Sequence, residues 1–224
     1  MKFTALAILI ALSSTGVYAE DKSFYLKASL GYMQFDSEDS FAVKEDLNST
    51  GYALTFGYRI NDYIAIEGGR ANLGNISRDY EFTVRDSEIY YDYDEIVVEN
   101  YDYKGTSESK LKSYSLGLAF STQIQQNLNA GIRLGVHQWC VDIRSRSEYS
   151  GTRSWYTEDR ELVSVEPYNS SYDWGSSKNS GSNPYYGAEV NWTTGDWGFS
   201  LEHTIYEIQD DTANLSSVGV TYSF

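Results

Sequence analysis

The sequence SSVGVTYSF, at residues 216–224, places a large side chain at every second position. These large residues are Val218, Val220, Tyr222 and Phe224, and they alternate with Ser217, Gly219, Thr221 and Ser223. A period of two is typical of a β-strand whose two faces meet different surroundings. We therefore expect a strand with one apolar face and one face of small residues.

The same alternation recurs in seven earlier segments, at residues 24–35, 50–60, 63–73, 111–122, 128–139, 185–192 and 197–206. Their second face consists mostly of Gly, Ser, Ala and Thr, whereas a soluble sandwich would show an ordinary charged surface there. A tilted strand needs ~9–11 residues to cross a bilayer, and most of the segments have this length. The pattern predicts an all-β fold, an eight-stranded antiparallel transmembrane β-barrel with its apolar side chains facing lipid. A soluble sandwich or a lipocalin-like barrel is the alternative.

The connections between these segments alternate between short and long. Short turns are expected at 61–62, 123–127 and 193–196, and long connections at 36–49, 74–110, 143–184 and 207–213. Short periplasmic turns and long extracellular loops are typical of outer-membrane barrels. Only a closed barrel pairs every backbone group within lipid, so the last strand must also pair with the first. Aromatic residues that suit a membrane interface flank two of the short turns: Tyr58, Tyr63, Trp192 and Trp197.

The first 19 residues have the pattern of a secretory signal peptide: a positive start, the apolar run FTALAILIAL, and small residues at Val17 and Ala19; a plain membrane anchor is the alternative. We expect cleavage near Ala19, which leaves residues 20–224 as the barrel in the outer membrane. Cys140 is the only cysteine, so it cannot form an internal disulfide. It fits a small side chain near a strand end, with a reactive thiol as the alternative.

The charge balance is strongly acidic, with 32 Asp and Glu against 17 Lys and Arg. This balance argues against nucleic acid or bare anionic lipid as the main partner. The chain also has 21 Tyr and only 2 Pro, a composition that suits long uninterrupted strands.

Two stretches resemble a known family. GYALTFGYRINDYIAIEGG at residues 51–69 is similar to a strand–turn–strand hairpin of the small eight-stranded outer-membrane barrels, and VGVTYSF at 218–224 is similar to their aromatic C-terminal signal. This family includes the transmembrane domain of outer-membrane protein A and the outer-membrane protein X type. The resemblance implies surrounding outer-membrane lipid and lipopolysaccharide, and recognition by the barrel assembly machinery. Because the chain stops where the barrel ends, anchoring to the cell wall is not expected.

The interior of an eight-stranded barrel is only wide enough for side chains. The predicted inward face carries three basic and three acidic residues: Lys27, Arg59 and Arg133, and Glu67, Glu189 and Glu202. Unpaired buried charge is costly, so we expect ion pairs, with Arg133 in contact with Glu189. A structural ion-pair plug is the favoured interpretation, and a gate for ions or small solutes is the alternative.

Neither catalysis nor a cofactor is expected. Lipid A deacylases of this size resemble one another in a His and a Ser two positions apart, and neither His137 nor His203 has a serine at that spacing. Weak candidates for hard-metal ligands occur in YYDYDE at 90–95, namely Asp92, Asp94 and Glu95. A solvated acidic loop, or loose divalent bridging to lipopolysaccharide phosphates, explains them equally well.

The long loops carry most of the negative charge and many of the tyrosines. Tyrosines are common in binding loops because they offer large contact area at low entropic cost. The candidates are Tyr80, Tyr90, Tyr91, Tyr93, Tyr101 and Tyr103. Because YEFTVRD and EIVVENYDY alternate like strands, we expect a hairpin that rises above the membrane and could add a strand from a partner. The third long connection is expected to remain a loop.

These features favour a surface-exposed barrel whose acidic, tyrosine-rich loops mediate adhesion, colonisation or resistance to host factors. The expected partner is a host or cell-surface protein, steered by the negative loops if it is cationic. The alternatives are a barrel with a structural role in the outer membrane, and a narrow gated porin-like channel.

Overall fold

The computed structural model describes residues 23–36, 42, 44–91 and 95–224, and their regular structure is β-strand alone. The expected signal peptide lies outside the described residues. No helix among the described residues could cross a membrane. The strands are β1 (Phe24–Asp36), β2 (Lys44–Asp46), β3 (Asn48–Arg59), β4 (Ile64–Tyr91), β5 (Glu95–Gln125), β6 (Leu128–Thr157), β7 (Leu162–Thr194), β8 (Trp197–Ile208) and β9 (Asp211–Ser223).

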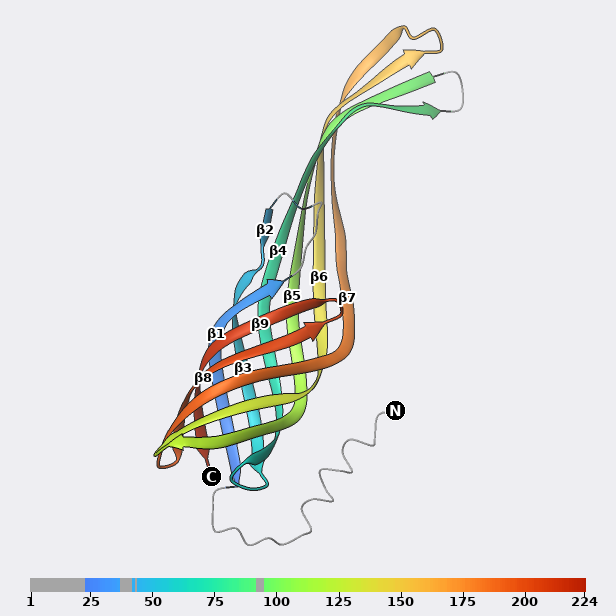
Figure 1. Ribbon diagram of the computed structural model, residues 1–224. Coiled ribbons are helices and arrows are strands. Elements are labelled where there is room, and N and C mark those ends of the chain that lie inside the picture. The colour runs from blue at the N-terminus through green and yellow to red at the C-terminus, as the bar shows by residue number, and fades with distance from the viewer. Residues whose placement is uncertain (1–22, 37–41, 43, 92–94) are drawn as a thin grey trace.

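Eight of these strands form a closed antiparallel barrel, as predicted (Figure 1). β1 pairs with β3 on one side and with β9 on the other, and the pairing of β4 with β5 completes the ring. Among the described strands, the short β2 pairs only with β4, beyond the ring. Closure leaves neither the first nor the last strand with an open edge within the barrel, which a membrane-spanning sheet requires.

The strands are strongly tilted. The register of the paired residues shows this tilt. A path that starts at Ser182 on β7 and passes from each residue to its partner on the next strand, once around the ring, returns to β7 at Trp192. The path thus ends ten residues from its start. A stagger of this size accompanies a tilt of ~35–45° in small barrels. Each strand of the wall therefore crosses the apolar layer obliquely.

The outer surface of the wall is apolar, as predicted. Leu201, Val136 and Val218 each expose about 60% or more of their surface, and their neighbours on the same face are likewise large and exposed. Aromatic side chains border this apolar band at both ends. They include Trp192, Trp197 and Tyr222 at the end with the short turns (the turn end) and Tyr32, Tyr52 and Tyr114 toward the end with the long hairpins (the hairpin end).

The three short connections are confirmed, because only a few residues separate β3 from β4, β5 from β6, and β7 from β8. Two of the long connections differ from expectation. The segment 143–184, expected to be a loop, is mostly the upper parts of β6 and β7, and β8 and β9 are joined by a turn of two residues where 207–213 was expected to be a longer loop. The strand expected at 63–73 continues to Tyr91, so that β4 and β5 form the projecting hairpin that the sequence predicted.

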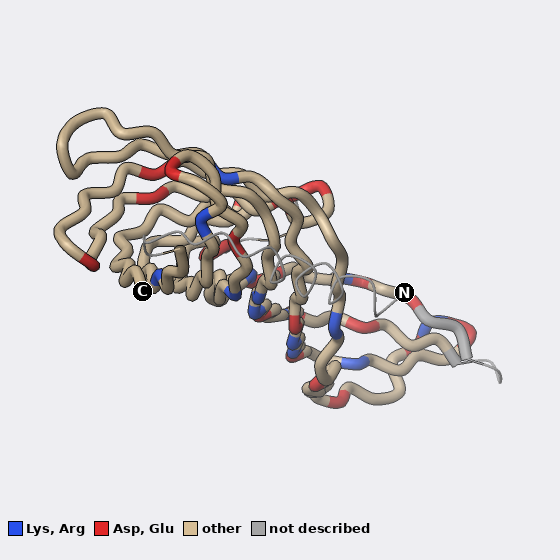
Figure 2. Tube along the Cα trace, turned by 90° about the horizontal axis from the view of Figure 1, so that it is seen from below, with Lys and Arg blue, Asp and Glu red and all other residues tan. Residues whose placement is uncertain are grey.

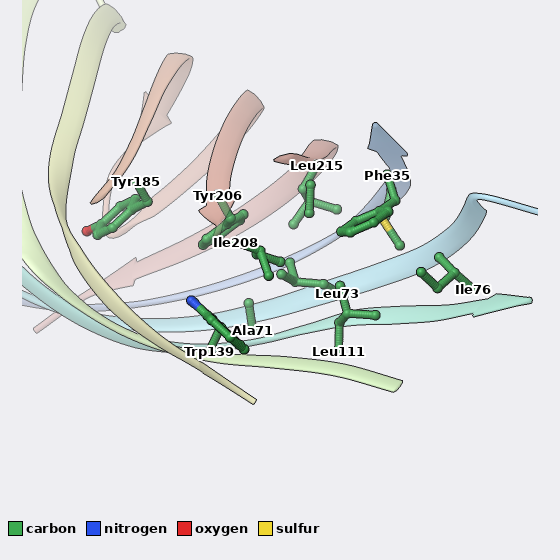
Figure 3. Close-up of a cluster of buried hydrophobic side chains, with 12 residues drawn as sticks. Phe35, Ala71, Leu73, Ile76, Leu111, Trp139, Tyr185, Tyr206, Ile208 and Leu215 are labelled. Atoms are coloured by element: carbon green, nitrogen blue, oxygen red, sulfur yellow. The ribbon is translucent and has the colours of Figure 1, made fainter. Parts of the chain in front are cut away.

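The barrel interior has two different halves. Toward the turn end it contains small residues and the charged side chains described below. Toward the hairpin end it is filled by large apolar side chains that point toward one another from several strands (Figure 3). The cluster includes Met33, Phe35, Leu73, Leu111, Trp139, Tyr185, Tyr206, Ile208 and Leu215. The expectation of a small-residue interior is therefore correct for only part of the barrel.

Candidate functional site

The upper parts of β4, β5, β6 and β7 continue beyond the barrel as one four-stranded sheet (Figure 1). We call this part the protruding sheet: residues 77–91, 95–110, 142–157 and 162–180. Its strands lie in the order β4–β5–β6–β7, and β5 and β6 remain paired up to Glu95 and Thr157. The sheet is thus a direct extension of one side of the barrel wall.

A bulge near the base of β4 decides which side chains share a face. The register shifts between Asn72 and Gly74, and Gly74 has a φ of 85°, which favours glycine. One extra residue reverses the alternation along a strand. As a result Phe82 lies opposite Tyr103, on the face that continues the inner side of the barrel. We call this the inner face of the protruding sheet.

Aromatic rings cross the inner face from β4 to β7. Phe82 stacks on Tyr103 with ring centroids 4.3 Å apart, and Tyr149 lies 5.1 Å from Tyr103 and 5.5 Å from Tyr101. On β7, Tyr172 lies 5.7 Å from Tyr149. Two further rings extend the row, Tyr168 at 5.9 Å from Tyr101 and Trp174 at 6.1 Å from Tyr172. We call these residues the aromatic ladder: Phe82, Tyr101, Tyr103, Tyr149, Tyr168, Tyr172 and Trp174.

A glycine makes one step of the aromatic ladder possible. Gly151 pairs with Tyr101 on β5 and with Tyr168 on β7, so it lies between the two rings. Without a side chain at this position, the rings meet across β6. A Cβ on Gly151 would also press against the backbone of Asn100.

A partly buried ion pair links β5 to β6 beside the aromatic ladder, and its arginine also contacts β7. Arg153 on β6 donates to Glu99 on β5, with Nη2 and Oε1 2.5 Å apart, and its guanidinium lies 4.7 Å from the ring centroid of Tyr168 on β7. Glu99 is only 7% exposed. Partial burial and the neighbouring Glu99 carboxylate raise the pKa of Tyr168 above its ordinary value.

The opposite face of the protruding sheet carries exposed charges. Arg85 pairs with Asp102 at 3.0 Å and Lys104 with Glu81 at 3.4 Å, and all four side chains are about half exposed or more. The Thr83 hydroxyl, followed by Arg85, holds the pKa of Asp102 below its usual range. Such exposed pairs contribute little to stability. Figure 2 marks the basic residues in blue and the acidic residues in red along the chain.

The structure brings together only some of the predicted loop residues. Tyr101 and Tyr103 belong to the aromatic ladder, and Tyr80 lies on the same face, opposite Gly105. Tyr90 and Tyr91 end β4 and Glu95 begins β5, whereas Tyr93, Asp92 and Asp94 lie outside the described residues. The weak metal site therefore stays a prediction. No group of three or more possible metal ligands occurs in the part of the chain that the structure describes.

Sequence reasoning missed most of the aromatic ladder. Phe82 was not singled out, and Tyr149, Tyr168, Tyr172 and Trp174 lie in the connection that was expected to be a loop. A signal was present, because Tyr168, Tyr172 and Trp174 all occupy even positions, as they would on one face of a strand.

Five of the six predicted lumen residues meet inside the barrel. Lys27 lies 2.8 Å from Glu189 and 3.3 Å from Glu202, and Arg133 contacts Glu189 and lies 3.3 Å from Glu202 and 3.9 Å from Glu67. The structure thus contains the expected contact between Arg133 and Glu189. We call these five residues the lumen cluster. Lys27, Glu67, Arg133 and Glu202 are almost fully buried, so their charges are shielded from water.

Hydroxyl groups complete the lumen cluster. Tyr25 donates to Glu67 at 2.6 Å, and Ser29 and Ser200 donate to Glu202 at 3.2 and 2.5 Å. Arg59, the sixth predicted residue, lies toward the turn end, where it donates to Ser223 and covers the ring of Tyr25. A cavity of about 140 Å³ opens there, lined in part by Arg59, Lys27 and Glu189. The lumen cluster separates this cavity from the apolar cluster of the other half.

The two histidines contact serines from neighbouring strands. Ser113 lies 2.9 Å from Nδ1 of His137, whose Nε2 lies 2.7 Å from the backbone carbonyl of Glu207. Because a carbonyl only accepts, Nε2 carries the proton and Nδ1 accepts from the Ser113 hydroxyl. His203 contacts Ser216 at 2.8 Å on the outer surface. Among the described residues, no carboxylate lies within 4 Å of either imidazole, and the group that orients His137 is the backbone carbonyl of Glu207.

The chain is similar to several solved structures. Solved structures similar in fold include the attachment invasion locus protein Ail of Yersinia pestis, with 16% identity, a TM-score of 0.42, and coverage of 90% of this chain and 99% of that chain. The N-terminal β-barrel domain of OprF from Pseudomonas aeruginosa has 11% identity, a TM-score of 0.45, and coverage of 91% and 98%. Neisserial surface protein A has 11% identity, a TM-score of 0.37, and coverage of 90% and 97%.

A search of curated protein sequences found no match. The model of the outer membrane protein beta-barrel domain, in contrast, matches residues 3–224, which is nearly the whole chain. This chain therefore belongs to the outer membrane protein β-barrel family.

Proposed function

We propose that this outer-membrane barrel binds a partner at the cell surface through the aromatic ladder, in adhesion, colonisation or resistance to host factors. The observation that carries the proposal is a row of rings across all four strands of a sheet that stands away from the membrane. Phe82, Tyr172 and Trp174 expose 50%, 49% and 67% of their surface, although nothing in the fold of the barrel requires them there. Exposed aromatic patches mark binding surfaces.

The construction of the protruding sheet supports this role. Tyrosine and tryptophan lose little side-chain entropy on binding, and here their neighbours already hold the rings in place. The ion pair of Arg153 with Glu99, and the contact of Arg153 with Tyr168, fix β5, β6 and β7 to one another beside the rings. A cationic protein segment suits this surface, because cations bind over aromatic faces and the chain carries a net charge of −15.

Both outer strands of the protruding sheet offer a second means of attachment. Among the described residues, β4 beyond Asp79 pairs only with β5, and β7 before Pro184 pairs only with β6. A free strand edge can accept an extended segment from another protein. An extended partner on β7 would lie next to Tyr168, Tyr172 and Trp174, so edge pairing and ring contacts would act together.

The test compares bacteria that display the wild-type barrel with bacteria that display Tyr149→Thr/Tyr172→Thr. Tyr149 touches three other rings, and threonine keeps the strand propensity. Adherence to cultured epithelial cells should fall at least about fivefold, since central aromatic residues dominate binding interfaces. The matched control, Glu81→Thr/Lys104→Thr, removes an ion pair from the opposite face and should adhere normally. Unchanged adherence of the ladder variant, at equal surface display, would refute the proposal.

The alternative of a narrow channel has less support. The lumen cluster and the apolar cluster fill successive parts of the interior, and the two would have to open together for a solute to pass. A purely structural role remains the main alternative to binding. Deletion of residues 80–103 tests it, because a structural barrel would lose no adherence when this hairpin is removed.

We also propose that the chain is not an enzyme and that the barrel assembly machinery reads its terminal strand. The incomplete environment of His137 and His203 supports the first proposal. For the second, Phe224 directly follows β9, which pairs on both sides, and its backbone N–H donates to the carbonyl of Phe24. Slow assembly of a Phe224→Ser variant into the outer membrane would support it, and normal assembly would contradict it.

A further inference from the structure

The outward face of the wall changes character at one level on β5. Leu118, Leu116 and Tyr114 point outward and are exposed, which places them in the apolar band. The next two outward positions toward the hairpin end are Lys112 and Lys110. With about 3.4 Å per residue, they lie roughly 7 and 14 Å beyond Tyr114 along the strand. Tyr114 is one of the aromatic residues that border the apolar band at the hairpin end, so both lysines lie beyond the hydrocarbon layer.

Further basic residues lie on the neighbouring strands at and above this level. Arg70 on β4 pairs in register with Tyr114, and its guanidinium lies 5.6 Å from the centroid of that ring. Lys178 on β7 and Arg144 on β6 lie farther up, on the same outward face. We call Arg70, Lys110, Lys112, Arg144 and Lys178 the basic patch. It occupies four adjacent strands at the base of the protruding sheet.

The basic patch has an excess of unpaired positive charge. Asp142 lies between Lys110 and Lys178 in the register, and Glu108 lies opposite Arg144. Two carboxylates against five cations leave an excess of three positive charges. Among the described residues, none of the five cations is within 4 Å of a carboxylate oxygen, in contrast to the paired arginines of the lumen cluster and of the protruding sheet.

This charge is unusual in its position as well as in its sign. The chain as a whole has a net charge of −15, so a local positive excess is not a consequence of composition. On the other side of the barrel, the outward positions at the hairpin ends of β1, β8 and β9 are neutral or acidic: Gln34, Asp36, Glu207, Thr212 and Asn214. Like charges on neighbouring strands repel one another, so such a patch is most stable when an anion lies against it.

The membrane itself supplies an anion at this height. The headgroup layer begins where the apolar band ends, and Lys112 and Arg70 lie at that boundary. The outer leaflet of the outer membrane contains lipopolysaccharide, whose phosphates lie in this layer and just above it. Arginine and lysine are the usual partners of phosphate, and their long side chains reach the headgroups from a lipid-facing wall.

We propose that the basic patch binds the phosphate groups of lipopolysaccharide, on one side of the barrel only. Arg70 and Lys112 lie level with the phosphates nearest the acyl chains. Lys110, Arg144 and Lys178 lie level with phosphates farther out. The lipid then packs against the base of the protruding sheet and neutralises the charge there. This contact needs no divalent ion, unlike the bridging considered for the acidic loop.

The test measures binding of purified lipopolysaccharide to the barrel in nanodiscs of zwitterionic phospholipid. The variant Lys110→Gln/Lys112→Gln/Arg144→Gln/Lys178→Gln should bind at least about tenfold more weakly, because each basic residue near an anionic surface adds to the affinity. The control Arg85→Gln/Lys104→Gln/Arg146→Gln/Arg160→Gln loses the same charge from exposed ion pairs and should stay within about twofold of wild type. Heat-modifiable gel mobility verifies that each variant is folded.

Three further measurements identify the ligand. Chemically dephosphorylated lipopolysaccharide should bind as weakly as the four-residue variant does, and vesicles of phosphatidylglycerol should not replace the native lipid. Inorganic phosphate at millimolar concentration should not compete. The proposal is overturned if the dephosphorylated lipid binds normally, if free phosphate or phosphatidylglycerol competes fully, or if the control variant loses as much affinity as the patch variant.

Discussion

Replacing Arg133 with methionine should destabilise the barrel strongly. Arg133 is 8% exposed and faces three carboxylates, and without it Lys27 is the only basic member of the lumen cluster. Glu67 would keep only the hydroxyl of Tyr25 as a close partner. Removing one partner of a buried ion pair typically costs about 3–5 kcal/mol, because the remaining charge stays desolvated. We expect the free energy of unfolding to fall by that amount.

The assay is equilibrium unfolding in urea, with the folded barrel in lipid vesicles and the fluorescence of its five tryptophans as signal. Arg85→Met is the matched control, because Arg85 is 55% exposed in a single ion pair and should cost about 0–1 kcal/mol. A double variant, Arg133→Met/Glu67→Gln, should recover part of the loss, since Glu67 is the carboxylate that loses its cationic partner when Arg133 is removed, whereas Glu189 keeps Lys27. If Arg133→Met costs no more than Arg85→Met, the reasoning about the lumen cluster is wrong.

Three other outcomes follow from the structure. Planar bilayers that contain the purified barrel should show no conductance steps, even for Arg133→Met, because the apolar cluster still fills the other half of the lumen; clear steps would contradict this. Gly74→Val should lower folding yield, since the bulge needs a φ of 85° and a Cβ would meet Ser49. In an NMR titration, Thr83→Val should raise the pKa of Asp102 toward that of an ordinary aspartate, and an unchanged titration would show that the Thr83 hydroxyl does not stabilise the carboxylate.

The barrel could be predicted because lipid imposes a simple rule on sequence. Val218, Val220 and Tyr222 need only alternate with small residues to indicate a strand in a bilayer, and every membrane-spanning strand repeats that rule. The lumen cluster was equally visible, because Lys27, Arg133 and their partners interrupt a face of small residues. Their contacts followed from the fact that a narrow interior leaves charged groups no other neighbours.

The protruding sheet was harder to predict because no membrane constrains it. Bulges shift the alternation near Gly74, near Val84, and between Arg144 and Arg146. After each bulge, a fixed period of two assigns side chains to the wrong face of the sheet. Tyr149 and Tyr172 come from separate strands, and only the pairing of those strands brings them together. The contact between His203 and Ser216 was missed for the same reason, since only the register of β8 against β9 places the two residues opposite each other.

The continuity of β4, β5, β6 and β7 from the barrel into the protruding sheet determines how the protein carries mechanical load. A pull on a bound partner acts nearly along these strands, so many interstrand hydrogen bonds resist it in shear at the same time. A domain on a flexible tether would instead peel away one bond after another. The proposed attachment surface and the barrel wall thus belong to the same four strands, so a force on the one is transmitted directly to the other.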